Sequence, residues 1–216
     1  MKIKHRISAL VSAIVAILLL YLWSFYAAHF MGAIWNSDEM SNYKTLPSKT
    51  IIKELRFHLD PFYDPHYALQ TLVERKDKAA VSQIIKMLNS HRSYYRQEAM
   101  RALANLGDSS AIEPLVNIVN RTPIDINYSK TKPPDNIEAL IALSKLKYEK
   151  IYGKGVELAT LKNDPNDFRS YGITMLSNFE KPESLPILEK ISQNDPEGYI
   201  RAKAKKAIER IKSVQK

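Results

Sequence analysis

The chain has 216 residues, which is enough for one membrane segment and one globular domain of ordinary size. Its formal net charge of +9 comes from the two ends, because residues 36–200 carry 22 basic and 22 acidic side chains, so no broad basic surface for nucleic acid is predicted. The chain has no cysteine, which excludes thiolate chemistry, disulfides and cysteine-ligated zinc.

The first predicted element is a transmembrane helix. Residues 7–28 are almost wholly apolar, and residues 7–37 contain no Asp, Glu, Lys or Arg. As a helix, the apolar segment would span roughly 33 Å, which exceeds the ~30 Å hydrocarbon layer of a bilayer. We therefore expect a single-pass signal anchor over residues 7–30, preceded by a short terminus at 1–6 and followed by a linker at 31–47.

A cleavable signal peptide is the alternative for this segment. Lys2, Lys4 and Arg6 would serve as the basic region of such a peptide, but the apolar stretch exceeds the usual 7–15 residues and no suitable pair of small residues lies near its end. The same basic residues precede the span, whereas Asp38 and Glu39 come first after it, and positive residues stay on the cytoplasmic side. We expect a cytoplasmic N-terminus and a periplasmic or otherwise extracytoplasmic remainder of the chain.

Five copies of a small–large–large pattern follow. In each copy, a small residue is followed four and seven positions later by a large one, which places all three on one face of a helix. Only Arg75, in the first copy, departs from the apolar pattern at the seventh position. Successive copies are offset by 31, 40, 33 and 32 residues. The small residues are Ala68, Ala99, Ala139, Gly172 and Ala204.

Each copy is predicted to be the second helix of a pair. Asp-Pro pairs such as Asp195-Pro196 mark the boundaries, because proline is tolerated in the first turn of a helix and disfavours helical backbone in the residue before it. The predicted first helices are Lys49–Leu59, Ala79–Leu88, Ser110–Val119, Ile151–Leu161 and Glu183–Ile191. The fold class is therefore all-α: an α-solenoid of five helix pairs over residues 48–212, with a tail at 213–216 and a single transmembrane helix before it.

The second copy carries the strongest family resemblance. Residues 96–115 read RQEAMRALANLGDSSAIEPL, which closely resembles a HEAT repeat of the phycobilisome-lyase-like type. Arg169 and Arg201 stand three residues before the small residue of their copies, as Arg96 does. The resemblance covers residues 48–212 and implies a curved platform for interactions. The lyase activity of a few such proteins is not carried over, because no residue recognisable as handling a bilin is present.

Two interpretations of Arg96, Arg169 and Arg201 are open. They could form a ladder that contacts an anionic ligand. In resembling arrays, however, this arginine bonds an aspartate or a carbonyl in the adjoining turn, and Asp164 and Asp195 are placed for that role. We expect the structural role.

The inner face of the solenoid is the predicted binding surface. Helix positions two before, two after and six after the small residue should line it, forming a polar stripe that becomes basic toward the C-terminus. An acidic or phosphate-bearing partner is one reading of the stripe, and a merely solvated face is the other. The stripe comprises His66, Gln70, Glu74, Gln97, Arg101, Asn105, Ile137, Ile141, Lys145, Ser170, Thr174, Asn178, Lys206 and Arg210. The residues proposed to bind a partner are Gln97, Arg101, Asn105, Lys145, Lys206 and Arg210.

The offset of 40 locates an insertion within the third pair, at residues 122–135. Insertions in solenoids map to loops and often border the binding face. Ile124, Ile126 and Tyr128 are apolar residues of this loop, and they either fold back onto the array or dock a partner. We add these three residues to the candidate partner-binding set.

The last segment, from Arg201 to Lys216, is predicted to be a basic amphipathic helix. Its apolar positions share one side and its lysines the other. Terminal repeats need a polar outer face, so a solubilising cap is the expected role. Contact with anionic lipid headgroups or envelope glycans is the alternative.

No pattern typical of catalysis or metal binding is found. The five histidines lack metal-ligand spacing, and no nucleophile elbow or glycine-rich phosphate loop occurs. His58, Asp60, Asp64 and His66 form the one local cluster of potential ligands, and turn chemistry around the Asp-Pro pairs explains it more simply. We therefore expect no enzymatic activity, no cofactor, no metal, no nucleic acid and no small-molecule substrate.

The expected function is that of a membrane-anchored scaffold or adaptor. Its partners would be membrane or envelope proteins of a bacterium, and residues 7–30 would hold it in the membrane. The alternative is an accessory enzyme or chaperone-like factor of the lyase-like HEAT group that handles a cofactor or a client.

Overall fold

The structure, a computed structural model, divides the chain into two units, residues 1–47 and 48–216. All the helices named below belong to the second unit, and every element in the described part of the chain is a helix. None of these described helices is both long and apolar enough to cross a membrane. The predicted anchor at 7–30 lies outside the described residues. The described residues are 43–55, 64–121, 134–162 and 167–215.

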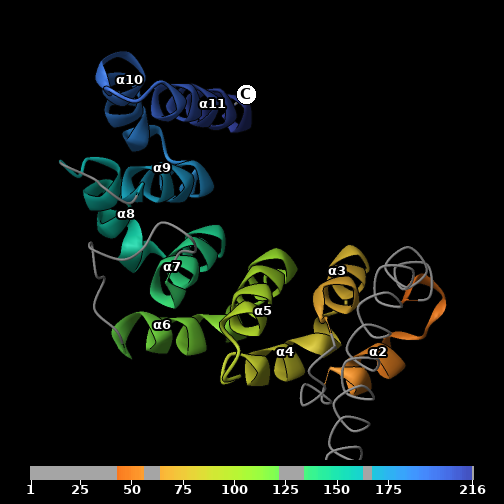
Figure 1. Cartoon of the computed structure of the whole chain (residues 1–216). Coiled ribbons are helices and arrows are strands. Elements are labelled where there is room, and N and C mark those ends of the chain that lie inside the picture. Colours follow the sequence, from red (N-terminus) through yellow and green to blue (C-terminus); the bar gives the residue numbers. More distant parts are fainter. Residues whose placement is uncertain (1–42, 56–63, 122–133, 163–166, 216) are drawn as a thin grey trace, which may run out of the picture. The chain divides into compact units, whose positions relative to one another are not determined.

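The helices alternate between two roles along the chain (Figure 1). The first helices of the pairs are α2 (Ser48–Glu54), α4 (Val81–Met87), α6 (Ile112–Arg121), α8 (Tyr152–Ala159) and α10 (Leu185–Asn194). The second helices are α3 (His66–Glu74), α5 (Ser93–Leu106), α7 (Asp135–Lys145), α9 (Phe168–Phe179) and α11 (Gly198–Val214). Each first helix packs against the second helix that follows it, and each second helix packs against the next. The predicted all-α array of helix pairs is confirmed and is consistent with an α-solenoid.

The first helices of the last four pairs begin with a single 3₁₀ turn, which the sequence analysis did not predict. Asp77 and Asp108 cap two of these turns, because their side chains accept hydrogen bonds from the backbone N–H groups of Ala79 and Ser110, both at 3.0 Å. The cap fixes the direction in which the chain enters the first helix. The four turns are Lys78–Ala80, Ser109–Ala111, Glu149–Ile151 and Pro182–Ser184.

The small–large–large face forms the core. The four small alanines are 0% exposed, and so are the large residues four positions after Ala68, Ala99 and Ala139. Only Ile208, at that position in the last copy, is half-buried. Each fully buried leucine contributes about 1.5–3 kcal/mol relative to an exposed one. Burial of this face therefore drives the pairing of the helices, as the periodicity predicts.

Four of the second helices end in a residue with left-handed backbone, eight positions after the small residue. Gly107 has a φ of 67° and ends α5 without strain, because glycine has no Cβ. Lys76, Lys147 and Glu180 adopt the same conformation, with φ values of 52°, 59° and 56°. A non-glycine residue there costs about 1–2 kcal/mol. The turn is thus set by the repeat and not by the residue that occupies it.

The packing of α8 against α9 depends on Gly172. A Cβ added at this residue would lie 2.1 Å from the backbone N of Ala159 and 2.6 Å from its Cα. Both distances are far below van der Waals contact, so the two helix backbones approach too closely for any side chain. Glycine is required at this position, where the other copies carry alanine.

We expect Gly172→Ala to lower the free energy of unfolding by about 1–3 kcal/mol, because α8 and α9 must separate to admit the methyl group. Chemical denaturation followed by circular dichroism measures the change. Gly153→Ala in α8 is the matched control, since a Cβ there meets nothing within 4 Å and should leave stability unchanged or slightly raised. Equal effects of the two substitutions would contradict the close approach.

Candidate functional site

Side chains of neighbouring second helices meet on the surface that the sequence analysis predicted to bind a partner. We number helix positions from the small residue of each copy, so that Ala99 is position 0 of α5 and Arg101 is position +2. Residues at positions −2, −1, +2 and +6 contact the adjacent second helix or border the groove beside it. We call the surface formed by these positions the second-helix face.

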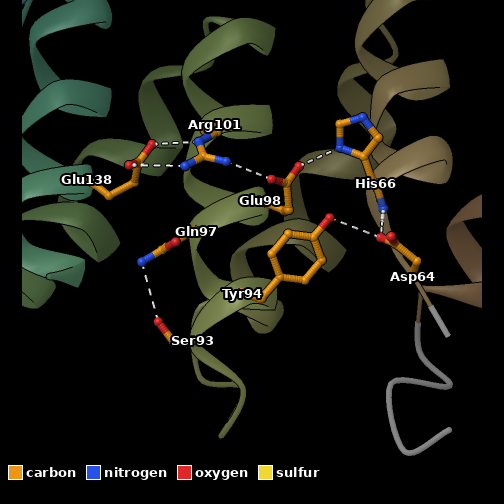
Figure 2. Close-up of polar contacts among 8 residues, drawn as sticks. All are labelled: Asp64, His66, Ser93, Tyr94, Gln97, Glu98, Arg101 and Glu138. Atoms are coloured by element: carbon orange, nitrogen blue, oxygen red, sulfur yellow. Dashed lines mark hydrogen bonds and ion pairs between the residues drawn. The ribbon is translucent and has the colours of Figure 1, made fainter. Parts of the chain in front are cut away.

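A chain of charged side chains crosses this face from α3 through α5 to α7, as Figure 2 shows. Arg101 lies between two carboxylates: its Nη1 donates to Oε1 of Glu98 at 2.8 Å, and its Nε donates to Oε1 of Glu138 at 2.9 Å. Nδ1 of His66 lies 3.0 Å from Oε2 of Glu98. These contacts join three helix pairs through side chains more than 30 residues apart in the sequence.

The two glutamates are buried, whereas the arginine is half exposed. The side chains of Glu98 and Glu138 are 10% and 8% exposed, against 48% for Arg101. Burial alone would lower the pKa of the Arg101 guanidinium, but its bonds to Glu138 and Glu98 outweigh burial and raise that pKa above its ordinary value. A buried carboxylate without a cation is costly, so Arg101 is committed to holding the glutamates.

Tyrosines tie neighbouring second helices together at their N-terminal ends. The hydroxyl of Tyr94 donates to Oδ1 of Asp64 at 3.2 Å, and the backbone N–H of His66 donates to the same oxygen at 2.9 Å. Tyr199 makes the corresponding bond to Asp167 in the last two pairs. Burial, together with the nearby aspartate, raises the pKa of both tyrosines. Asp64 therefore acts as a turn residue before α3, as the Asp-Pro pair predicted.

The repeated arginines make the structural contacts that were expected of them. Nη1 of Arg169 donates to Oδ2 of Asp195 at 2.7 Å, and Nη1 of Arg201 donates to the carbonyl of Asp195 at 2.6 Å. Arg96 forms an ion pair with Asp135 at the start of the next second helix. These arginines bind turns of the protein itself, so an anionic ligand is not needed to explain them.

A second network joins the C-terminal ends of α7, α9 and α11. Nζ of Lys147 lies 2.6 Å from Oε2 of Glu180, and Nη2 of Arg210 lies 2.8 Å from Oε1 of the same residue. Hydrogen bonds from Lys147 and Arg210 hold the pKa of Glu180 below its ordinary value. Beneath them, the amide of Asn178 donates to the hydroxyl of Ser144 at 2.9 Å. The left-handed turn residues Lys147 and Glu180 thus connect consecutive pairs.

Most of the predicted partner-binding residues lie on the surface of the second-helix face. Lys145 of α7 donates a hydrogen bond to Oδ1 of Asn105 of α5. The exposed members of the predicted set are Arg101, Asn105, Lys145, Lys206 and Arg210. Ile124, Ile126 and Tyr128 lie outside the described residues, as do Asp164, His58 and Asp60 of the other sequence-based arguments.

Three members of the predicted stripe are buried instead, and one of them is Asn178, which is 8% exposed. Ile137 is 0% exposed and packs with Leu158 and Phe168 of the next pair, because an apolar side chain gains free energy at this seam. Gln97 is 4% exposed, and its amide lies 3.4 Å from the hydroxyl of Ser93. The expectation that Ile137 lines the open face is wrong, and Gln97 is not at the surface of this structure.

Position −1, which was not among the predicted binding positions, also lies on this face. It is occupied by Glu98, Glu138 and Lys203. These side chains point to the preceding second helix and decide the charge of each groove. A signal was available: copies two and three both carry glutamate directly before the small residue, and Arg101 follows Glu98 by three positions, the spacing of an ion pair on a helix. Across the described residues, no three His, Asp or Glu side chains form a group that would hold a metal ion.

We expect the Arg101–Glu138 contact to couple α5 to α7. A double-mutant cycle with Arg101→Met and Glu138→Gln should give a coupling free energy of about 1–2 kcal/mol. The reason is that the hydrogen bonds between the two side chains are charge-assisted and the carboxylate of Glu138 is buried. Urea denaturation of the four proteins measures it. The exposed pair Lys154–Glu157, at 2.7 Å within α8, is the control and should couple by no more than about 0.5 kcal/mol. Equal coupling in the two cycles would contradict this role.

One comparison with known proteins bears on the repeats. Residues 49–127 match the family model described as HEAT repeats. The matched segment runs from α2 past the end of α6 and contains the copy with the strongest resemblance. No curated protein matches the chain at a significant level. The match supports the interpretation of these helix pairs as HEAT repeats, which generally act as scaffolds for protein–protein interactions.

Proposed function

We propose that this protein is a membrane-anchored scaffold whose HEAT-like repeats bind another protein through the second-helix face. The observation that carries the proposal is the face itself. Its polar side chains are exposed yet held in place by bonds between helix pairs, as in the Arg101 network, so a partner would meet a preorganised surface.

The proposal assigns no enzymatic step to the chain. Its resemblance to lyase-like HEAT repeats concerns helix packing, and the network around Arg101 consists of contacts that stabilise the fold. The proposed function is therefore binding, and partner specificity would be set by the exposed residues Asn105, Lys145, Lys206 and Arg210, together with the exposed part of Arg101, whose charge is paired with Glu98 and Glu138. The loop residues Ile124, Ile126 and Tyr128 complete the proposed set.

We further propose that residues 7–30 anchor the protein in the membrane of a bacterial envelope. The length and apolar composition of residues 7–28 support a transmembrane span. Three basic residues before the span and Asp38 and Glu39 after it support a cytoplasmic N-terminus and extracytoplasmic repeats. The partners would then be membrane or envelope proteins.

Crosslinking tests the binding face. Because the chain has no cysteine, Asn105→Cys places a single thiol on the second-helix face, and Glu113→Cys places one on the exposed side of the first helix α6. A thiol-directed photo-crosslinker in intact cells, followed by mass spectrometry, should attach Asn105→Cys to a defined partner in stoichiometric amounts. Glu113→Cys is the matched control and should not capture that partner. Equal capture by both variants, or capture by Glu113→Cys alone, would refute binding through this face.

Thiol labelling tests the topology. Ser213→Cys, at an exposed position of α11, should react with a membrane-impermeant maleimide in cells whose outer barrier has been opened. His5→Cys should react only after the inner membrane is lysed. The reverse pattern would invert the proposed orientation, and a mature protein that begins after Ala28 would show that the leader is cleaved and does not anchor the chain.

A further inference from the structure

Two grooves on the second-helix face occupy the same register in different parts of the array. One, of ≈ 180 Å³, lies between α3 and α5, and the other, of ≈ 300 Å³, lies between α9 and α11. Both are bounded by positions +1, +2 and +5 of the earlier helix and by positions −1, +2, +3 and +6 of the later helix. The later helix contributes Glu98, Arg101, Ala102 and Asn105 to the first groove and Lys203, Lys206, Ala207 and Arg210 to the second.

The charges of the two grooves differ at these equivalent positions. Position −1 is Glu98 in the first groove, and its carboxylate meets both His66 and Arg101. In the second groove the same position is Lys203, so that three cations share one helix face. The first groove is neutralised by its own residues, whereas the second carries an excess of positive charge.

The cations of the second groove have few internal partners. Nζ of Lys203 donates to the hydroxyl of Ser170 at 2.6 Å, and burial lowers the pKa of this lysine, although the charge of Asp167 partly offsets that effect. Arg210 pairs with Glu180, which also binds Lys147. Within the described residues, neither Lys203 nor Lys206 forms an ion pair. A partly buried ammonium that bonds only a hydroxyl would gain from a carboxylate that entered the groove.

The array itself shows how a carboxylate binds in this register. In the α3–α5 groove, Arg101 at position +2 of the later helix holds the carboxylate of Glu98, at position −1 of the same helix, at 2.8 Å. In the α9–α11 groove, Lys206 stands at the same position +2, but position −1 is Lys203, and the acid Glu180 is bonded to Arg210 and not to Lys206. The three cations stand at positions i, i+3 and i+7 of α11, which spreads their charge over roughly 10 Å along the helix. A row of cations of this length fits successive acidic side chains of a peptide better than a single small anion.

We propose that the groove between α9 and α11 binds an acidic peptide segment of the protein partner, whose carboxylates contact Lys203, Lys206 and Arg210. This inference rests on the proposed scaffold function and names the chemistry of the partner. Thr174 and Asn178 line the opposite wall of the groove. The charge of the groove gives specificity, because a basic segment would be repelled.

Fluorescence anisotropy tests the proposal with the full-length chain in detergent and a fluorescein-labelled hexaglutamate peptide. The double variant Lys203→Met and Lys206→Gln should weaken binding by about tenfold or more, because two charge-assisted contacts are lost while the lysine stem is replaced by one of similar size. Lys206→Gln alone should also weaken binding, and since Lys206 is exposed its loss does not disturb the core. Thermal unfolding of each variant checks that the fold is retained.

Lys205→Gln is the matched control, because Lys205 is an exposed lysine of the same helix that does not line the groove. An equal loss of affinity with Lys205→Gln would show that the peptide responds to the net charge of α11 and not to the groove, and this would overturn the proposal. Full displacement of the peptide by inorganic phosphate at an equal concentration would also overturn the proposal. The proposal would fail as well if anionic vesicles bound through Lys203 and Lys206 and the peptide did not bind. If Asn105→Cys captures a partner and the double variant of the lysines does not weaken that capture, the scaffold function stands and the groove assignment fails.

Discussion

The close approach of helices at the small residue is the constraint on which the rest of the array depends. An alanine or glycine at position 0 lets the second helix of a pair lie against the neighbouring backbone, and at Gly172 the backbones leave no room even for a methyl group. This spacing fixes where the flanking positions fall. A residue at position −1 comes within hydrogen-bonding distance of position +2 or −2 of the preceding second helix, as Glu138 does with Arg101 and Glu98 does with His66. The helices cannot shift apart, so these polar contacts follow from the apolar packing.

The same arrangement of helix positions carries paired charges in one part of the array and, among the described residues, unpaired positive charges in another. Around Arg101, the residues at positions −1 and +2 neutralise one another, and the buried carboxylates of Glu98 and Glu138 stabilise the stack only while the guanidinium is present. Around Lys203, the register is unchanged but the acid is missing. A single change of charge at position −1 therefore converts a structural contact into an open, positively charged groove without changing the fold.

The sequence predicted the helix pairs well because the signal for them is local. A small–large–large triplet on one helix face predicts from local sequence which side of the helix is buried. The left-handed residue that follows four of the second helices was visible only at Gly107, where glycine marks it. Contacts such as that of Glu138 with Arg101 join residues 37 positions apart and depend on how far each helix is rotated about its axis. Periodicity does not report that rotation. For this reason, Ile137 was placed on the open face although it packs into the seam with the next pair.

The free-energy cost of binding an ionic group of a partner differs from one part of the second-helix face to another. To bind between α3 and α5, an ionic group would have to displace Arg101 or His66 from Glu98 and leave a buried carboxylate unpaired, which costs several kcal/mol. Between α9 and α11, a carboxylate that binds Lys203 and Lys206 would displace the hydroxyl contact of Lys203 and no ion pair of either lysine among the described residues, whereas Arg210 would share its charge with Glu180. Ionic recognition is therefore favoured in the last two pairs, whereas the charges of the first three pairs are paired with one another, so a partner that touches Asn105 or Lys145 would be recognised there by contacts other than an exchange of ion pairs.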